Sequence, residues 1–376
     1  MPYNQSVVEL LDILKCVECD SSKLIIKQDN KSIWDGYAFQ NERGRCLVCE
    51  KCNTIYPMTD DDIPIMWTSQ IKSILRGDKS NNVSDALNAN ITHYNRISDS
   101  YSVNFRRDKS LEKKIISGAA RLLPTLRNQN ITAVDNTYHL DIGCGPGHVL
   151  GWIGDITNRK IGLDVSLANL RNARQSTGAY VVLGDATVMP FRDDSFILVT
   201  ESSVLHHIFE WKKVIQEACR VCSKKNGGIL FDSEPTFESL SLSMLARFVF
   251  EMRWPVYKIL SFFDSKKIHF RDIKLAREYY QTAEIHNQPG RGFSVKAVED
   301  VFRNADFNTE IFLSSNEHLQ MRQTIPWNEA GWKRIILHLL SGHNPLLSKY
   351  GSFTMLAVPH TEKKGSPQKD VKDLLT

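Results

Sequence analysis

The sequence lacks any long apolar run. None of its 376 residues lies in an uncharged apolar stretch of about 18 residues, the length that a helix needs to cross a bilayer. The beginning of the chain also lacks the basic region, apolar core and small-residue cleavage site of an export signal. We therefore expect a cytoplasmic protein without a membrane-spanning segment.

The sequence has little excess of either charge. Lys and Arg number 47 against 43 Asp and Glu, which gives a net charge of +4. The basic residues are scattered and form no stripe interleaved with aromatics, so nucleic-acid binding is not required. Apolar and charged contents of 42% and 24% are ordinary for a globular protein. The length suits one large domain and one small domain.

Cysteines are concentrated near the start of the chain. Five of the eight precede residue 53 and form the C-x-x-C pairs Cys16/Cys19 and Cys49/Cys52, with Cys46/Cys49 as a competing second pair. Such clustering in a protein without an export signal indicates a metal before disulfides. Four thiolates on two hairpins suit Zn²⁺ in a closed, structural site. Buried cysteines without a ligand are the alternative.

Residues 49–66 resemble the end of the small zinc-ribbon family that includes the activator subunit of tRNA methyltransferases. The stretch reads Cys-Glu-Lys-Cys-Asn-Thr-Ile-Tyr-Pro-Met-Thr-Asp-Asp-Asp-Ile-Pro-Ile-Met, and the resemblance covers about residues 10–67. Met58 and one extra acidic residue depart from the family's pattern. The resemblance implies that Cys16, Cys19, Cys49 and Cys52 are the zinc ligands.

A glycine-rich turn, Asp141-Ile-Gly-Cys-Gly-Pro-Gly147, follows a short apolar run. Glycines at the alternate positions 143, 145 and 147 predict a sharp passage from strand to helix that leaves the backbone bare for a ligand. The turn is not the G-x-G-x-x-G fingerprint of NAD-binding proteins, because Pro146 and Gly147 intervene and His148 is not glycine. No P-loop lysine follows either, so a phosphate cradle is not expected.

Apolar runs alternate with helix-length segments from residue 138 onward. The predicted strands are 138–142, 159–164, 179–183, 195–200 and 228–233, and two more, near 310–313 and 352–358, would form an antiparallel pair. This rhythm predicts an α/β fold, a Rossmann-like, doubly wound, seven-stranded and mostly parallel sheet. Such sheets bind ligands at the carboxyl ends of their strands. Asp164, Asp185 and the segment 201–207 lie at those ends.

These motifs together resemble the class I S-adenosylmethionine-dependent methyltransferases of the methyltransferase type 11 kind. The resemblance rests on the glycine turn, on Gly162-Leu-Asp164-Val-Ser, on Gly184-Asp185-Ala186 with Pro190, and on Val204-Leu-His-His207. It covers residues 91–235 and, more weakly, 285–358. Asn226 replaces the usual proline of one turn, and Asp306 stands where glycine is usual.

The resemblance implies a role for each loop. The glycine turn would pass under the methionine part of the cofactor, Asp141 would receive its ammonium group, Asp164 would accept the ribose hydroxyls, and Asp185 with Ala186 would meet the adenine. Helix capping is the alternative for Asp164 and Asp185. The expected cofactor set is Tyr94, Tyr101, Asp141, Gly143, Cys144, Gly145, Gly147, Asp164, Val165, Asp185, Ala186, Glu201 and Ser202. Within it, Tyr94 and Tyr101 lie on a predicted helix over 91–101 that either covers the cofactor or packs on the domain, and Cys144 is expected only to pack.

Two histidines follow the fourth predicted strand. His207, or else His206, is a candidate general base, because the unperturbed imidazole pKa lies near neutrality. Packing or loop orientation is the alternative for both.

A long insertion, 236–290, separates the fifth and sixth predicted strands. Its first half is rich in apolar residues interrupted by charges, which predicts amphipathic helices that act as a lid over the substrate, a dimer contact or a peripheral membrane surface. Its end and the following loop carry His286 and Arg291, which are candidate substrate contacts.

We therefore expect a methyltransferase that acts on oxygen, nitrogen or carbon of a small-molecule, glycan or lipid-linked acceptor, with a structural zinc. An RNA methyltransferase that grips RNA with the zinc ribbon and a catalytically silent scaffold are the alternatives. The expected division is a zinc ribbon (1–68), a linker with a cofactor-capping helix (69–110), the methyltransferase core (111–235 and 291–360), the helical lid (236–290) and a disordered tail (361–376).

Overall fold

The computed structural model describes residues 7–28, 44–77, 82–105, 109–127, 138–154, 159–263, 273–313, 329–343 and 351–360. The predicted disordered tail therefore lies outside the described residues. The strands are β1 (Leu24–Gln28), β2 (Arg45–Cys49), β3 (Ile55–Pro57), β4 (Tyr138–Ile142), β5 (Arg159–Asp164), β6 (Tyr180–Leu183), β7 (Phe196–Ser202), β8 (Gly228–Pro235), β9 (Phe307–Leu313) and β10 (Ser352–Pro359). The helices are α1 (Ser69–Leu75), α2 (Asn82–Phe105), α3 (Lys109–Arg127), α4 (His148–Ile153), α5 (Leu167–Thr177), α6 (Trp211–Val221), α7 (Phe237–Leu240), α8 (Met244–Glu251), α9 (Arg253–Phe263), α10 (Ile273–Ala283), α11 (Val295–Asn304) and α12 (Glu329–Leu340), with short 3₁₀ turns η1 (Val7–Asp12) and η3 (Leu205–His207).

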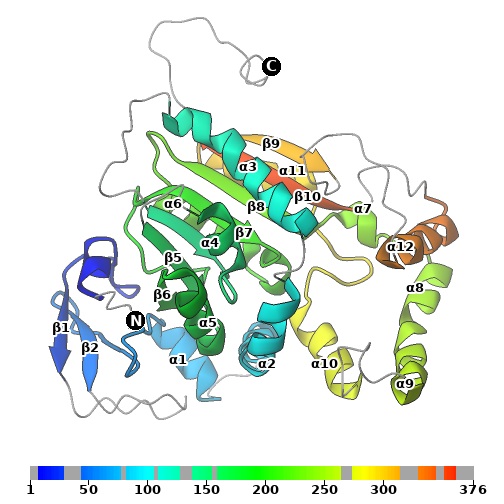
Figure 1. Cartoon of the computed structure of the whole chain (residues 1–376), viewed down its shortest axis with the longest axis horizontal. Coiled ribbons are helices and arrows are strands. Elements are labelled where there is room, and N and C mark those ends of the chain that lie inside the picture. Colours follow the sequence, from blue (N-terminus) through cyan, green and yellow to red (C-terminus); the bar gives the residue numbers. More distant parts are fainter. Residues whose placement is uncertain are drawn as a thin grey trace, which may run out of the picture.

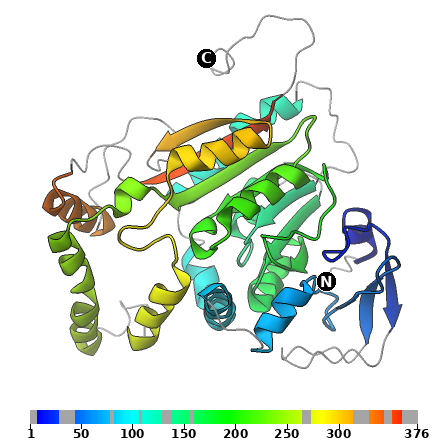
Figure 2. The same cartoon turned by 180° about the vertical axis from the view of Figure 1, so that it is seen from behind.

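The large sheet has seven strands in the order β6-β5-β4-β7-β8-β10-β9. Strands β4 to β8 pair in parallel, and β10 runs antiparallel to both β8 and β9. This confirms the predicted doubly wound, mostly parallel sheet, including its antiparallel pair. Alternate residues face opposite sides: Leu198, Leu230 and Leu356 pack with α3 and α4, whereas Val199 and Phe231 pack with α6 and α11. The two helical layers are visible from the front and from behind (Figures 1 and 2).

The N-terminal module is a three-stranded antiparallel sheet in the order β1-β2-β3. The segment after it runs along the edge strand β6 of the large sheet: Met66 N donates to Leu183 O (2.8 Å), and Leu183 N donates to Pro64 O (3.0 Å). The module and the insertion helices α8 to α10 flank the large sheet on opposite sides (Figure 1). The edge of the large sheet is therefore covered by the chain's own N-terminal module.

Two predicted helix limits are wrong. The polar stretch at 80–85, expected to be a linker, includes the first turn of α2, which begins at Asn82; Val83, Ala86 and Leu87 form an apolar face there, and polar neighbours do not break a helix. The sequence also predicts a helix from about Leu111 to Leu123 that ends near Pro124, but α3 continues to Arg127, because a proline in a last turn removes only one hydrogen bond.

Candidate functional site

The glycine turn joins β4 to α4 and cannot carry side chains at its key positions. Gly143 and Gly147 have φ values of +62° and +88°. A Cβ atom on Gly147 would lie 2.9 Å from Ala173 Cα in α5, and one on Gly143 would lie 2.4 Å from Val204 Cγ2. The turn therefore exposes backbone to the space at the carboxyl end of β4, as the sequence predicted.

Asp141, near the end of β4, holds a carboxylate oxygen without a partner. Thr200 Oγ1 donates to Asp141 Oδ1 (2.7 Å), whereas the buried Oδ2 atom accepts no hydrogen bond from the described residues. Burial raises the pKa of Asp141 to about 7. A buried acceptor left open beside a bare turn fits a donor supplied by a ligand.

Asp164, at the end of β5, braces the glycine turn. Its Oδ2 atom accepts from Gly145 N (2.8 Å), and its Oδ1 atom accepts from Ser166 N (2.7 Å). The residue that caps α5 is Ser166, whose side chain accepts from Asn169 N, so Asp164 is not the cap of that helix. Burial raises the pKa of Asp164 to about 6. The Asn169 side chain and the Val165 backbone also hydrogen-bond to this carboxylate.

Asp185 closes its own turn after β6. It accepts hydrogen bonds from Thr187 N (2.9 Å) and Thr187 Oγ1 (2.7 Å). Burial raises its pKa. No helix follows it among the described residues 184–195, so helix capping does not explain it either.

One pocket unites these loops. Eight of the predicted cofactor residues line it, together with residues of α2 that the sequence reading had assigned to the linker. The lining is Val83, Ala86, Leu87, Asn90, Tyr94, Gly143, Gly145, Leu163, Asp164, Val165, Asn169, Gly184, Asp185, Ala186, Thr187, Ser202, Ser203, Val204, His207, Ile208, Phe209 and Glu210. The loops that follow four parallel strands thus meet in one concave site beneath α2.

The other predicted cofactor residues do not line this pocket. Asp141 and Gly147 belong to the turn behind it, and Cys144 is buried with its Sγ atom packed against Gly162 of β5. Glu201 is fully buried. The side chain of Tyr101 lies outside the described residues. Their predicted contacts with a cofactor therefore stay predictions.

His207 faces the pocket with one ring nitrogen. Its Nδ1 atom lies 3.2 Å from Ala283 O, and its Nε2 atom lies 3.2 Å from the Tyr94 hydroxyl. Because a carbonyl can only accept, Nδ1 carries the proton and Nε2 accepts from Tyr94. Burial and the neighbouring His206 lower the pKa of His207 to about 4. The side chain is therefore neutral at pH 7, and its role as a general base stays a prediction.

His206 is buried in a network of carboxylates. Its Nδ1 atom lies 3.0 Å from Glu234 Oε2, and its Nε2 atom lies 3.5 Å from Glu284 Oε2. Burial alone would lower the pKa of His206, but the charges of Glu234 and Glu284 outweigh burial and raise it. Val204 N donates to Glu201 Oε1 (2.5 Å) and to Glu234 Oε1 (2.7 Å). Burial and the adjacent Glu234 raise the pKa of Glu201 well above its usual range.

The two glutamates around His206 were missed in the sequence. Glu234 follows the predicted fifth strand by one residue, so an acid at the carboxyl end of a strand was the available signal. Glu284 follows α10, 77 residues beyond His207, and no local pattern indicates that it returns to the site.

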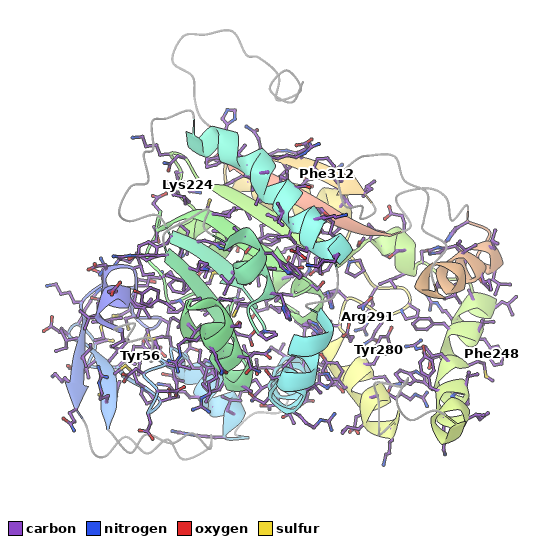
Figure 3. The ribbon with its side chains drawn as sticks, in the orientation of Figure 1. Tyr56, Lys224, Phe248, Tyr280, Arg291 and Phe312 are labelled. Atoms are coloured by element: carbon purple, nitrogen blue, oxygen red, sulfur yellow. The ribbon has the colours of Figure 1, made fainter. Side chains whose placement is uncertain are left out.

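The predicted substrate residues His286 and Arg291 do not line the pocket. His286 N donates to His206 O (2.9 Å), and the His286 ring packs against Phe293. Arg291 is exposed and Nη1 lies 3.4 Å from Ile285 O; it extends from the loop that follows α10 (Figure 3). Their contact with a substrate stays a prediction.

The insertion contributes to the site through the end of α10, which supplies Ala283 and Glu284. Helix α10 also packs against α2, where Tyr279 Oη donates to Asn90 Oδ1 (3.2 Å). Helices α8 and α9 instead present exposed apolar side chains, among them Met244, Phe248 and Ile259, with Phe248 on α8 at the rim of the molecule (Figure 3). Among the described residues no helix is long and apolar enough to cross a membrane. The lid, dimer and membrane roles expected for the apolar first half of the insertion therefore all stay predictions.

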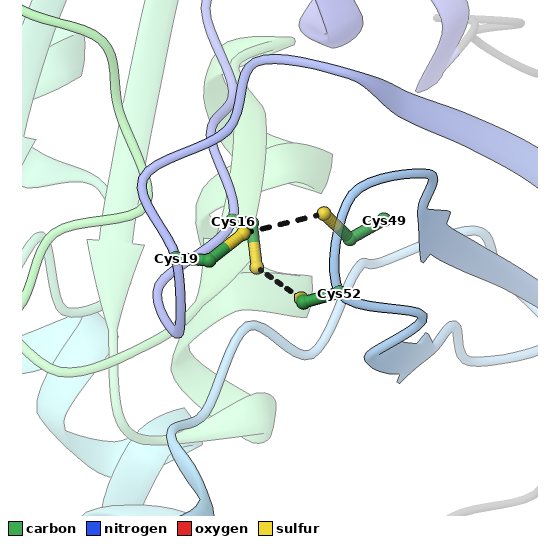
Figure 4. A group of neighbouring side chains, drawn as sticks. All are labelled: Cys16, Cys19, Cys49 and Cys52. Carbon is green, nitrogen blue, oxygen red and sulfur yellow. Dashed lines mark hydrogen bonds between the residues drawn. The ribbon is translucent and has the colours of Figure 1, made fainter.

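The four predicted zinc ligands lie together in the N-terminal module. The sulfur atoms of Cys16, Cys19, Cys49 and Cys52 all lie within 4.8 Å of one another (Figure 4). Cys16 Sγ is 3.5 Å from Cys52 Sγ, and Cys19 Sγ is 3.6 Å from Cys49 Sγ. Cys46 is buried elsewhere, with Sγ 3.6 Å from Lys27 O. The choice of Cys49/Cys52 as the second pair agrees with this placement, and the spacing suits a tetrahedral metal.

Comparison with known proteins identifies the central part of the chain. Residues 140–231 match the family model of a methyltransferase domain. An uncharacterized protein of Methanocaldococcus jannaschii is 27% identical over 190 residues, which cover 48% of this chain and 66% of that protein. A demethylmenaquinone methyltransferase of Renibacterium salmoninarum is 36% identical over 111 residues, which cover 28% of this chain and 46% of that enzyme. The chain thus spans less than two thirds of these relatives.

Solved structures match this chain at low identity and with TM-scores below 0.5. A complex between the Haloferax volcanii Trm112 methyltransferase activator and a putative methyltransferase has a TM-score of 0.42 at 15% identity and covers 71% of this chain and 98% of that one. The plantazolicin methyltransferase BamL, in complex with a triazolic desmethylPZN analog and SAH, has a TM-score of 0.45 at 11% identity and covers 74% of this chain and 97% of that one.

Proposed function

We propose that this chain is an S-adenosylmethionine-dependent methyltransferase that acts on oxygen, nitrogen or carbon of a small-molecule, glycan or lipid-linked acceptor. The observation that carries the proposal is the glycine turn inside the matched methyltransferase domain, with Asp141 and Asp164 on either side of it. The open Oδ2 atom of Asp141 offers a place for the cofactor's ammonium group, which would supply the missing donor.

The remaining loops would hold the other parts of the cofactor. Asp164 would accept the ribose hydroxyls, and Asp185 would accept from the adenine amino group while Ala186 contacts the ring. When bound, the cofactor supplies a methyl group already activated on a sulfonium. The protein then needs to align the acceptor and exclude water. The apolar residues of α2 that line the pocket, and α10 packed against α2, support that task.

We also propose that the cysteine cluster holds a structural zinc. Four thiolates complete a tetrahedral shell and leave no position open for a substrate. Zinc there would stabilise the N-terminal module, which in turn packs on the methyltransferase sheet.

The test of the cofactor pocket is calorimetric binding of S-adenosylhomocysteine to Asp164→Ala. Hydrogen bonds that involve a charged partner contribute about 1.5–3 kcal/mol, so we expect affinity to fall by about 10- to 150-fold. Asp300→Ala on the exposed face of α11 is the control and should bind as the wild type does. Equal affinity in the Asp164 variant would remove this residue from the site, and no binding to the wild type would overturn the cofactor assignment.

A further inference from the structure

Three side chains of the kinds that bind metals meet beside the pocket. His206, His207 and Glu284 each offer a ligand atom, and these atoms all lie within 4.8 Å of one another. The histidines come from η3, which follows β7, and Glu284 comes directly after helix α10. The group is therefore built by two parts of the chain that the fold brings together at the acceptor side.

The remote nitrogen of each imidazole is already engaged. His206 Nδ1 pairs with Glu234 Oε2 at 3.0 Å, and His207 Nδ1 pairs with Ala283 O at 3.2 Å. Histidines that bind metals almost always use one nitrogen for such a carboxylate or carbonyl, which fixes the ring and points the other nitrogen at the ion. The Nε2 atom of His206 then faces Glu284, while the Nε2 atom of His207 accepts from the Tyr94 hydroxyl, which an ion at this place would replace.

Glu284 completes the group on the opposite side. Its Oε2 atom lies 3.5 Å from His206 Nε2 and accepts from Asn287 Nδ2 at 2.9 Å. Two ligand atoms that are each about 2.1 Å from one ion lie about 3.0–3.4 Å apart. The distance between His206 and Glu284 is close to this range, and a ligand atom of His207 lies within 4.8 Å of both. The Tyr94 hydroxyl, 3.2 Å from His207 Nε2, marks the side that opens to the pocket.

We propose that His206, His207 and Glu284 bind a divalent transition-metal ion whose open positions face the acceptor end of the pocket. Two imidazoles and one carboxylate with open positions suit Fe²⁺, Mn²⁺, Co²⁺ or Zn²⁺. A dication would also lie beside two carboxylates, since both Glu234 and Glu284 lie within 3.5 Å of His206. In this arrangement His207 is a metal ligand and not the general base expected from the sequence.

The inference rests on the proposed function and narrows its acceptor. An ion at this place favours an acceptor that carries a hydroxyl, phenol or carboxylate oxygen, because such groups coordinate the ion and lose a proton more easily when bound to it. An acceptor methylated on an unactivated carbon would gain nothing from the ion.

The experiment is a titration of the full-length chain with Co²⁺ alone, followed by calorimetry and by visible absorption. The protein is prepared with zinc so that the cysteine cluster is already filled. Cobalt bound by nitrogen and oxygen differs in colour from cobalt bound by thiolates, so the two sites are told apart. We expect about one equivalent of Co²⁺ with a nitrogen–oxygen spectrum, and Glu284→Gln should weaken binding by at least about tenfold. Glu278→Gln, an exposed residue of α10, is the matched control and should bind as the wild type does.

His207→Asn provides a second variant if Glu284→Gln fails to fold by circular dichroism, and it should likewise lose the cobalt spectrum. The metal site would be overturned if the wild type bound no Co²⁺ with a nitrogen–oxygen spectrum. It would also be overturned if Glu284→Gln and Glu278→Gln bound Co²⁺ with equal affinity. Binding of S-adenosylhomocysteine is measured separately: if it persists while cobalt does not bind, the metal inference alone fails. If cobalt binds and S-adenosylhomocysteine does not, the proposed function fails instead.

Discussion

Asp141 and Asp164 give the pocket its dependence on pH. Burial raises the pKa values of these carboxyls to about 7 and about 6 from an ordinary 3.8. A raised carboxyl pKa means that the folded chain holds the proton longer than the unfolded chain. Each group therefore lowers the free energy of unfolding as pH rises from about 4 to its folded pKa, and has no further effect above it.

The same titration predicts how cofactor affinity changes with pH. Because the ionised carboxylate is the better acceptor, binding of S-adenosylhomocysteine should be about tenfold weaker at pH 5 than at pH 7 for a group with a pKa near 6. Calorimetry in one buffer series measures this. Asp164→Asn, which cannot ionise, should bind more weakly at pH 7 and lose part of the slope; an unchanged slope would assign the effect to another group.

Residues of the site differ in how far the sequence could place them. Asp164 and Asp185 end predicted strands of a parallel sheet, so topology alone brings them to one edge. The position of Glu284 and the raised pKa of Glu201 depend on which distant segments pack together and on how much water they exclude. Neither spacing nor composition carries that information.

At the scale of elements, the turn from β4 to α4 allows a direct test. Gly147 lies at φ +88° and faces the backbone of α5, with a Cβ position 2.9 Å from Ala173 Cα. Gly147→Ala should therefore lower the free energy of unfolding by about 2–4 kcal/mol, from left-handed strain and overpacking. Urea denaturation measures this.

Gly151→Ala on the same short helix α4 is the control. Its Cβ position meets only Thr177 Cγ2, at 3.7 Å, and its φ is not in the left-handed region. Alanine there should leave stability unchanged or raise it by up to about 1 kcal/mol. Equal effects of the two substitutions would contradict the packing described for the turn.

Strands were easier to predict from the sequence than helix limits. The five parallel strands are buried apolar runs bounded by turns, and each lies within two residues of its predicted limits. The predicted helix over 91–101 omits the start of α2. The polar residues there made the segment resemble a linker, although Val83, Ala86 and Leu87 form an apolar face on the helix. Those residues line the pocket, so the missed turn was part of the site.

At the scale of the whole molecule, the cysteine cluster links metal content to folding. Cys49→Ser should remove about one equivalent of zinc, measured by plasma mass spectrometry, and lower the melting temperature, because binding of a structural zinc contributes directly to folding. Cys46→Ser should retain the zinc, since Cys46 lies outside the cluster. Full retention of zinc by Cys49→Ser, or its loss from Cys46→Ser, would reverse the ligand assignment.

The contact between the N-terminal module and the large sheet extends beyond one strand. Lys15 N donates to Pro190 O (2.9 Å) and Arg192 N donates to Ile13 O (2.8 Å), while Asp61 pairs with Arg171 and Arg174 of α5. The sequence predicted a module and a core but not their contact, because hydrogen bonds between separate sheets follow no sequence period.

The position of residues 64–66 along β6 also bears on self-association. An uncovered edge strand presents unpaired amide and carbonyl groups to any passing chain, and is a common starting point for aggregation. Here Pro64 and Met66 take up both backbone groups of Leu183, and covalent attachment keeps them at a local concentration that no separate subunit reaches at ordinary abundance. The segment that follows the N-terminal module therefore protects this edge of the large sheet from pairing with another chain, and we expect a chain in which this segment is displaced to aggregate more readily.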